Sequence, residues 1–485
     1  MQRERLGSRL GFILLSAGCA IGVGNVWKFP WMVGQYGGGA FVLFYVIFLL
    51  ILGLPIMTME FAVGRASQKS PVRAYQVLEK PGSRWHIHGY LAMIGNYLLM
   101  MFYTTVCGWM LHYFYLTAAG RFVGATTEQV GAAFGEMLSR PGVMAGCMIA
   151  VVVIGFLINS FGLQGGLERV TKVMMIALLA IMVVLAVNSI RTPGSSEGLR
   201  FYLIPDFSRM AETGVANVVV GAMNQAFFTL SLGIGAMAVS GSYTGKGRAL
   251  LGEAVNVAVL DTFVAFTAGL IIFPACFAFD VSPDSGPNLI FVTLPNIFNH
   301  MAGGRLWGSL FFVFMAFAAF STVLAVFENI MSCCMDLTGW SRKKTAAINI
   351  VLMILLSMPC VLGFNVWSGF QPFGPGSNVL DLEDFLVSNL WLPLGSLVYL
   401  LFCTSRYGWG WKNFQNEANE GGGIKVRDGI RFYVSYILPL IVLVIFVLGI
   451  KDKFFAQIIL EKMGAVRYNY RCTHHMPAWR NGTRS

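Results

Sequence analysis

Two glycine pairs interrupt apolar stretches of this 485-residue chain. Gly22–Val23–Gly24 lies inside a first apolar run, and Gly233–Ile234–Gly235 lies inside a sixth. A helix that unwinds in hydrocarbon leaves backbone groups without hydrogen-bond partners, which costs several kcal/mol per group. Freed carbonyl oxygens coordinate hard cations, and the N-terminus of a half-helix attracts an anion. The pairs therefore predict a mid-membrane site for a small cation and an anionic group.

Neutral polar side chains stand next to both pairs. Asn25 follows the first pair, and Thr229 and Ser231 precede the second, with no lone cationic side chain at either break. This composition suits Na⁺ together with a zwitterion. The alternative is that the glycines only permit close helix packing, as small residues do elsewhere. Two matched pairs with adjacent polar residues favour the binding site.

Asp261 is the other unusual residue, deep in the apolar run "LLGEAVNVAVLDTFVAFTAGLIIFP". A carboxylate inside a membrane costs about 2.5–3.5 kcal/mol on insertion scales, so it indicates function by default. A cation bound next to it would offset that cost. A purely structural hydrogen bond is the alternative.

The elements that must position these residues are membrane-spanning helices. The chain is 56% hydrophobic and only 12% charged, which is more apolar than a soluble domain can bury. A span needs about 20 residues to cross a core of about 30 Å. The sequence predicts an all-α polytopic membrane protein with eleven spans, at about 10–33, 40–64, 87–118, 142–159, 166–189, 214–240, 252–278, 306–336, 346–364, 380–403 and 430–450.

The two interrupted spans are the first and the sixth, and an offset of five spans reverses direction across the membrane. Spans 1–5 (about 10–189) and 6–10 (about 214–403) therefore predict inverted five-helix repeats, with broken helices 1 and 6 and an extra span at 430–450. Matching breaks in two halves indicate a transporter with a central site. We expect one transmembrane transporter domain over 1–450 and a tail, 451–485, of unknown role.

The net charge of +11 reflects topology and predicts no nucleic-acid partner. Basic connections such as "RASQKSPVRAYQVLEKPGSR" and "SRKK" fall on one side if the N-terminus is cytoplasmic, which predicts a multi-pass protein of the cell (inner) membrane. With eleven spans the basic tail would lie outside, against this rule, but late segments weigh less.

Other functional classes have weaker support. The nine cysteines are expected as small core residues, and His86 and His88 have no third metal ligand nearby. A membrane enzyme would need a histidine or cysteine paired with an acid or base, and His112 and His300 lack such partners in sequence. A channel would need a filter, normally in a symmetric oligomer, whereas both breaks lie in one chain.

Three segments carry a resemblance to a known family: "GCAIGVGNVWKFP", "GGGAFVLFYVIFLLILGLPIMTMEFAVGR" and "AFFTLSLGIGA". They resemble the neurotransmitter:sodium symporter family, above all its bacterial amino-acid transporters, over about residues 3–450. The resemblance implies Na⁺-coupled symport by alternating access, with one or two Na⁺ ions, an amino-acid substrate, the lipid bilayer as surroundings and no required oligomer. A transport-inactive receptor on the same fold remains the alternative.

The resemblance also implies two ion sites. The first Na⁺ would bind the substrate carboxylate together with Ala20, Asn25, Thr229 and Asp261. The second would bind the carbonyls of Gly18, Ile21 and Ala318 with the hydroxyls of Ser321 and Thr322.

By the same resemblance, a substrate pocket lies beside these ions. Its expected lining is Cys19, Ala20, Val23, Gly24, Leu99, Tyr103, Phe228, Thr229, Ser231, Ile234, Thr322 and Val326. Tyr103 would meet the carboxylate, and Phe228 would cover the site from outside. The side-chain end is apolar, which predicts a neutral hydrophobic or aromatic amino acid and leaves its identity open. The expected gate pairs are Lys28 with Asp384 outside and Arg3 with Asp336 inside.

Two departures from family patterns refine the expectation. Members that carry monoamines have an aspartate where this chain has Gly22, so an amine without a carboxylate is not the expected substrate. Chloride-dependent members have an asparagine and a serine where this chain has Asp261 and Ala265. The carboxylate of Asp261 would replace the chloride charge, which predicts chloride-independent transport, with a proton neutralising Asp261 on the return step.

Overall fold

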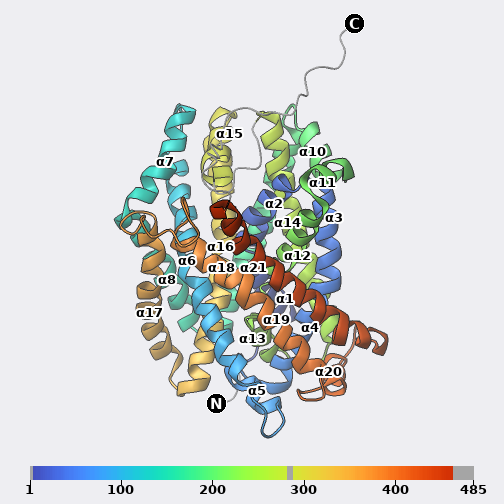
Figure 1. The fold of residues 1–485 in the computed structure, drawn as a ribbon. Coiled ribbons are helices and arrows are strands. Elements are labelled where there is room, and N and C mark those ends of the chain that lie inside the picture. Colours follow the sequence, from blue (N-terminus) through green and yellow to red (C-terminus); the bar gives the residue numbers. More distant parts are fainter. Residues whose placement is uncertain (1–3, 281–287, 463–485) are drawn as a thin grey trace.

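The computed structural model describes residues 4–280 and 288–462, and in these ranges the chain forms helices and no strand (Figure 1). Short stretches of wider, π-type turn (η) continue several of the helices. The first half contains α1 (Arg9–Ala20), η1 (Gly24–Lys28), α2 (Phe29–Gln35), α3 (Gly39–Phe48), η2 (Leu49–Gly53), α4 (Leu54–Ser67), α5 (Pro71–Leu78), α6 (Ile87–Ala118), α7 (Thr127–Ser139), α8 (Pro141–Ser160), η3 (Leu163–Glu168) and α9 (Arg169–Arg191).

The second half has longer connections. It contains α10 (Ser196–Leu203), α11 (Phe207–Thr213), α12 (Val215–Thr229), α13 (Ala236–Ser242), α14 (Leu250–Ala278), η4 (Leu289–Thr293), α15 (Leu294–His300), α16 (Gly304–Thr338), α17 (Arg342–Gly363), α18 (Val379–Phe385), η5 (Leu386–Trp391), α19 (Leu392–Thr404), α20 (Trp411–Ala418), the single 3₁₀ turn η6 (Asp428–Ile430), η7 (Tyr433–Ile437) and α21 (Leu438–Lys462).

The described residues contain nine helices that are long and apolar enough to cross a membrane. A tenth span results if α1 and the η1–α2 segment, which meet at an angle of 54°, are counted together. The span predicted at 214–240 is instead two shorter helices, α12 and α13, separated by residues 230–235. Nine of the other predicted spans agree with the helices to within a few residues at their ends. The last one, predicted to end at 450, lies in α21, which continues for twelve more residues to Lys462. The total of eleven remains a prediction.

The second break is unwound because its backbone enters the left-handed region. Ser231, Gly233 and Gly235 have φ angles of 50°, 95° and 76°. Glycine tolerates such angles at no steric cost, whereas the serine is strained. Gly233 also packs directly against the backbone of Leu392, where a Cβ atom would overlap the Leu392 carbonyl. Both effects require glycine at this position.

The first break has a different cause. Helix α1 ends at Ala20, Ile21 is extended with φ −73° and ψ 106°, and helical structure resumes at Gly24. Neither Gly22 nor Gly24 has a positive φ angle. A Cβ atom on Gly22 would instead overlap the hydroxyls of Tyr103 and Thr322. Here the glycine allows other side chains to approach the unwound backbone.

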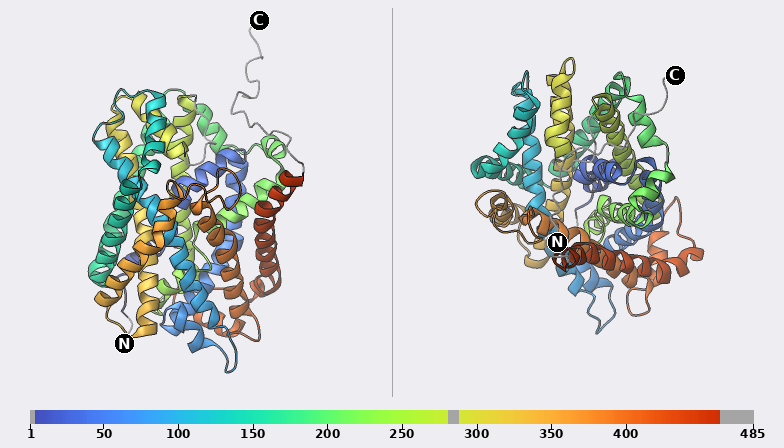
Figure 2. Two further views of the ribbon diagram at one scale, coloured as in Figure 1. Left: turned by 60° about the vertical axis from the view of Figure 1, so that its left-hand side comes forward. Right: turned by 45° about the horizontal axis from the view of Figure 1, so that its top comes forward.

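The two broken spans lie among the longest helices. Helix α6 packs against α16, α8 and α17, while α1 packs against α16, α14 and α9, and α13 packs against α4. The views in Figure 2 show most of the long helices running along one common direction, with α21 (red) on the outside of the bundle. The breaks are therefore enclosed by α4, α6, α14 and α16.

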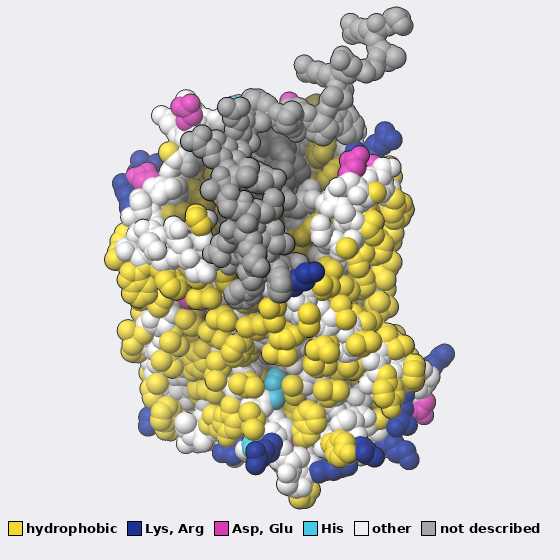
Figure 3. Space-filling model, in the orientation of Figure 1, with side chains coloured by type: hydrophobic (Ala, Val, Ile, Leu, Met, Phe, Trp, Pro, Cys, Tyr) yellow, Lys and Arg dark blue, Asp and Glu magenta, His cyan; other side chains and the backbone are white. Residues whose placement is uncertain are grey.

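The outer surface agrees with a protein embedded in lipid. Figure 3 shows hydrophobic side chains over the middle of one face and Lys and Arg side chains along its lower edge, where α5 and α20 lie. Large apolar residues such as Leu50, Val173 and Leu355 are more than half exposed. Contiguous exposed apolar surface of this kind is typical of a membrane-facing protein.

Candidate functional site

Asp261 on α14 lies at the junction of three other elements. The Asn25 amide nitrogen donates to carboxylate Oδ1 at 2.8 Å and to the Asp261 carbonyl at 3.2 Å. The hydroxyls of Thr229 and Tyr45 donate to Oδ2 at 3.1 Å and 3.3 Å. Asp261 is fully buried, and its hydrogen-bond partners are neutral side chains. A buried carboxylate without a basic partner can be offset by a bound cation.

Residues of the first break complete this region. The Asn25 side-chain oxygen accepts a bond of 3.1 Å from the Gly22 N–H, and the Gly24 carbonyl accepts one of 2.9 Å from Gln225. Ala20 is the last residue of α1 and lines a central cavity. The structure thus brings together three of the four predicted ligands of the first Na⁺ through direct bonds, with Ala20 at the adjoining helix end.

The second predicted ion set also converges. The Thr322 hydroxyl lies 3.2 Å from the Gly18 carbonyl and 3.1 Å from the Ile21 carbonyl. The Ser321 hydroxyl lies 3.2 Å from the Ile21 carbonyl and 2.9 Å from the Ala318 carbonyl. This set contains only carbonyl and hydroxyl oxygens, which are ligands suited to a hard cation.

A cavity of about 20 Å³ lies between the two breaks, with room for about one water molecule. Its lining consists of Cys19, Ala20, Gly22, Gly24, Leu99, Tyr103, Phe228, Ser231, Thr322, Val387 and Leu392. Eight of these belong to the predicted pocket. The other predicted pocket residues, Val23, Thr229, Ile234 and Val326, are buried but do not line this cavity.

The polar groups of the cavity face the unwound backbone. The Tyr103 hydroxyl accepts a 2.8 Å bond from the Val23 N–H, and the Ser231 hydroxyl donates to the Cys19 carbonyl at 3.3 Å. Phe228 borders the cavity from α12, and the Lys28 ammonium lies 3.8 Å from the centre of its ring. Sequence reasoning missed Gly22, Val387 and Leu392 as lining residues.

Glu60 on α4 is a further residue that sequence reasoning missed. Its carboxylate accepts a 2.5 Å bond from the Gly233 N–H, inside the second break, and the side chain is fully buried. The signal was available, because Glu60 lies in an apolar span just as Asp261 does. Glu60 therefore holds the unwound part of the sixth span from one side.

The predicted outer gate pair is in contact. The Lys28 ammonium lies 3.5 Å from the Asp384 carboxylate, and the Ser388 hydroxyl donates to that carboxylate at 2.7 Å. The side chains of Lys28 and Asp384 are 24% and 34% exposed, so solvent screening weakens this ion pair.

The predicted inner pair cannot be compared directly, since Arg3 lies outside the described residues. The Asp336 carboxylate accepts bonds of 2.8 Å and 2.6 Å from the backbone N–H and the hydroxyl of Ser70, the residue before α5. Asp336 therefore holds the start of α5.

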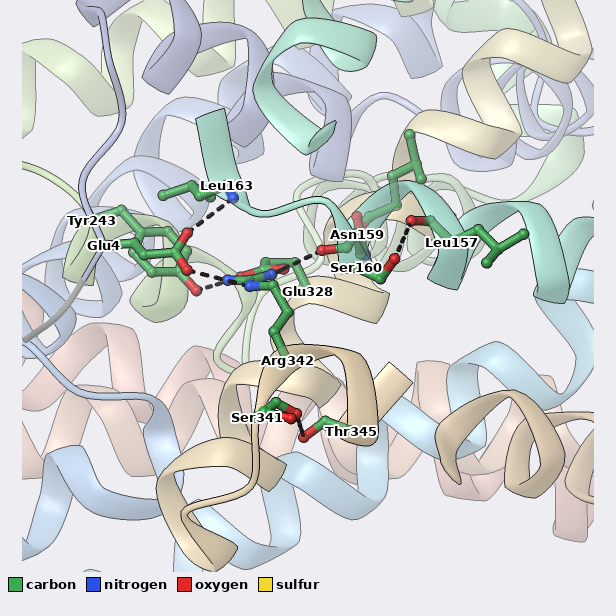
Figure 4. Close-up of polar contacts among 11 residues, drawn as sticks. Glu4, Leu157, Asn159, Ser160, Leu163, Tyr243, Glu328, Ser341, Arg342 and Thr345 are labelled. Atoms are coloured by element: carbon green, nitrogen blue, oxygen red, sulfur yellow. Dashed lines mark hydrogen bonds and ion pairs between the residues drawn. The ribbon is translucent and has the colours of Figure 1, made fainter. Parts of the chain in front are cut away.

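A different ionic cluster lies on the N-terminal side of the first break. Figure 4 shows Arg342 reaching between Glu4 and Glu328. Its guanidinium makes two bonds to Glu328, of 2.6 Å and 2.9 Å, and lies 3.3 Å from Glu4. The Tyr243 hydroxyl donates to Glu328 at 2.6 Å, and the other Glu4 oxygen accepts from the Leu163 N–H at 2.9 Å. The cluster joins the N-terminal segment, α16, α17 and the end of α13.

Comparisons with known proteins identify relatives of this chain. The chain matches the model of the "sodium:neurotransmitter symporter family" over residues 3–127 and 126–470. It is 33% identical to the uncharacterized sodium-dependent transporter YhdH of Bacillus subtilis (strain 168), over 90% of this chain and 96% of that protein. It is 23% identical to the sodium-dependent serotonin transporter of Drosophila melanogaster, over 92% of this chain and 76% of that protein.

A solved structure has the same fold. The crystal structure of MhsT in complex with L-phenylalanine superimposes with a TM-score of 0.82 at 35% identity, covering 92% of this chain and 99% of that one. The family match spans nearly the whole described chain and includes both breaks. The chain therefore belongs to the sodium:neurotransmitter symporter family.

Proposed function

We propose that this chain is a Na⁺-coupled symporter of a neutral hydrophobic or aromatic amino acid that works by alternating access. Family membership makes it a multi-pass, sodium-dependent transporter and not an enzyme. The main support for the amino-acid and Na⁺ assignment is that one cavity lies between the two breaks. Asp261 bonds Asn25 and Thr229 beside the breaks, and the Ser321 and Thr322 hydroxyls contact carbonyls at the first one.

The lining of the cavity supports the substrate class. Leu99, Phe228, Val387 and Leu392 are apolar, and the lining residues include no charged side chain. A charged substrate side chain would lose its hydration there without a partner. MhsT, the solved relative, binds L-phenylalanine. A neutral apolar side chain fits this environment best.

The helix ends around the cavity suit the zwitterionic part of an amino acid. The C-terminal end of α1 at Ala20 offers carbonyl oxygens to an ammonium group, and the start of η1 offers the Gly24 N–H and the positive end of a helix dipole to a carboxylate. The Tyr103 hydroxyl is a second donor for the carboxylate. This arrangement supports an α-amino acid as the substrate. It disfavours a simple amine, because this chain has Gly22 at the position where family members that carry monoamines have an aspartate.

Two Na⁺ ions have suitable oxygen sets. The first set would include the substrate carboxylate, so that substrate and ion each bind better when the other is present. We propose that Asp261 supplies the negative charge that makes transport chloride-independent, and that a proton neutralises it on the return step. One charge moved through 100 mV is worth about 2.3 kcal/mol, and a tenfold gradient adds about 1.4 kcal/mol. Each ion then supports accumulation of about 500-fold.

Alternating access requires barriers on both sides of the first break. Along the first span, Lys28 with Asp384 lies after the break, and Glu4 with Arg342 lies before it. The cavity of about 20 Å³ is smaller than an amino acid, so binding requires Phe228 and the unwound segments to move apart.

The orientation and domain limits belong to the same proposal. We place the N-terminus in the cytoplasm of the cell and the protein in its cell membrane, as the Lys and Arg side chains along the edge at α5 and α20 support. The transporter domain is proposed to cover 1–450, with an unassigned tail at 451–485.

Counterflow in proteoliposomes with the twenty amino acids, in Na⁺ or in choline, tests the proposal. We expect Na⁺-dependent exchange of several hydrophobic or aromatic amino acids, unchanged when gluconate replaces chloride. Loss of uptake in gluconate would overturn the chloride assignment. Na⁺-dependent binding without counterflow would identify a receptor instead, and exchange confined to charged amino acids would overturn the substrate class.

A further inference from the structure

The carbonyl of Ile234, in the middle of the second break, is held by side chains and not by a helix. The Asn96 amide on α6 donates to it at 2.8 Å, and the Asn329 amide on α16 lies 3.5 Å from it. Asn329 also donates to the side-chain oxygen of Asn96 at 2.7 Å. Both asparagines are buried, with exposures of 1% and 0%.

These amides form a connected pair with little freedom. The second donor of Asn96 is used by the Ala92 carbonyl, at 2.7 Å, on its own helix. The Asn96 side chain is therefore fixed in orientation by three partners, and the Ile234 carbonyl is fixed by Asn96. A buried carbonyl that lost this donor would be unsatisfied, at a cost of about 1–3 kcal/mol.

The side chain of Ile234 packs between two elements that line the cavity. A Cβ atom on Gly95 would lie 3.1 Å from Ile234 Cγ2 and would overlap the Trp391 indole. The indole nitrogen of Trp391 donates to the Leu91 carbonyl at 2.8 Å, which holds the ring on α6. Gly95 lies one helical turn before Leu99 on α6, and Trp391 directly precedes Leu392.

Leu99 and Leu392 are apolar lining residues of the cavity. Ile234 therefore lies in the layer behind the apolar end of the pocket, and its depth is set by the amide pair. Its backbone has no helical hydrogen bond that would resist a small shift.

We propose that Asn96 and Asn329 are positioning residues that set which substrate side-chain sizes the pocket accepts. They hold the Ile234 carbonyl and so fix the space behind Leu99 and Leu392. This inference rests on the proposed amino-acid transport. Loss of the amide pair lets the unwound segment retreat from the cavity, which favours large side chains over small ones.

The test compares Asn329→Leu with Asn349→Leu in the full-length protein in proteoliposomes. Leucine keeps the branched shape and the number of side-chain heavy atoms of asparagine, is somewhat larger, and removes its hydrogen bonds. Asn349 is the matched control, because it is also buried and bonds the Tyr97 hydroxyl at 2.5 Å, away from both breaks. The readout is the ratio of the inhibition constants of L-tryptophan and L-alanine against a labelled amino acid that the unmodified protein transports.

We expect Asn329→Leu to lower the ratio of the L-tryptophan inhibition constant to the L-alanine inhibition constant by about tenfold, so that L-tryptophan binds relatively better. The Na⁺ concentration for half-maximal uptake should change less than twofold. Asn349→Leu should leave the ratio unchanged. A general structural role would lower uptake of all substrates equally, and that result would overturn the inference.

Gly95→Ala provides a second and opposite test. The added methyl group presses on Ile234 and Trp391 and narrows the space behind the cavity, so the ratio of the L-tryptophan inhibition constant to the L-alanine inhibition constant should rise. If Asn329→Leu does not fold, Asn329→Ser, which keeps a short donor, should give a smaller shift in the same direction as Asn329→Leu. An unchanged ratio in an active Asn329→Ser protein together with an unchanged ratio in Gly95→Ala refutes the inference.

The two proposals fail in different ways. If the unmodified protein exchanges none of the twenty amino acids in Na⁺, the transport proposal fails and this inference falls with it. If the unmodified protein transports and the variants keep its ratio, only the role of the amide pair is refuted.

Discussion

The amide of Asn25 donates a 2.8 Å hydrogen bond to the carboxylate of Asp261. This bond joins η1, which begins directly after the first break, to an unbroken helix, α14. Thr229, at the end of α12, donates to the same carboxylate. One acidic side chain therefore connects both broken spans, and a change in its charge should be felt by both.

Asp261→Asn should weaken Na⁺ coupling, because it removes the one full negative charge that the protein contributes to the first proposed ion set, beside the substrate carboxylate. We expect the Na⁺ concentration for half-maximal uptake to rise at least about tenfold, which corresponds to about 1.4 kcal/mol. Initial uptake rates at increasing Na⁺ measure this. Tyr45→Phe, which removes one neutral bond to the same carboxylate, is the control and should change the value much less.

Thr322→Val should impair the second proposed ion set while preserving side-chain shape. The variant loses a hydroxyl that contacts the Gly18 and Ile21 carbonyls. We expect about a tenfold loss of apparent Na⁺ affinity. Thr104→Val is the matched control, since Thr104 is buried on α6 and bonds its own helix and Ser357. Equal effects of the two substitutions would contradict the ion assignment.

Cys19 should report on access to the cavity. Its thiol belongs to a cavity-lining residue that is 1% exposed. Asp384→Ala removes the partner of Lys28 and should speed alkylation of Cys19 by a small maleimide severalfold, and Na⁺ with an amino acid that the protein transports should slow it again. Mass spectrometry of the labelled peptide measures the rate, with Cys19→Ala as the blank. Labelling that is insensitive to both changes would argue against an outer gate at this pair.

Arg342→Ala should destabilise the protein strongly. It leaves the carboxylate of Glu328, whose side chain is 2% exposed, without its bidentate partner. Removing one partner of a buried ion pair typically costs about 3–5 kcal/mol. Replacing both, as Arg342→Met with Glu328→Gln, should recover much of the lost thermal stability. Unfolding midpoints in detergent compare the two, and a double variant no more stable than Arg342→Ala would contradict this reasoning.

Much of the fold could be predicted because its signals are local. Long apolar runs gave the spans, and glycine pairs next to Asn25 and Thr229 gave the breaks. The family model and the MhsT structure confirmed the predicted family, and the structure confirmed the all-helical fold. The structure also brings Ser321 and Thr322 to the carbonyls expected from the family resemblance.

The rest depends on packing that a single span does not reveal. Val387 and Leu392 look like any other apolar residues in the tenth span, yet both line the cavity, one within the π-type turn η5 and one directly after it. Asn96 and Asn329 lie 233 positions apart, so only the fold reveals that they are partners. Glu60 is different, since a carboxyl in an apolar run could have been recognised from the sequence.

The bond network around Arg342 has a practical consequence for anyone who handles this protein. Glu4 is held by Arg342 and by the Leu163 N–H, so the residues that begin at Glu4 are anchored against α17 and η3. A fusion partner or affinity tag attached in front of them would compete for this docking position. Expression vectors should carry such additions at the carboxyl end.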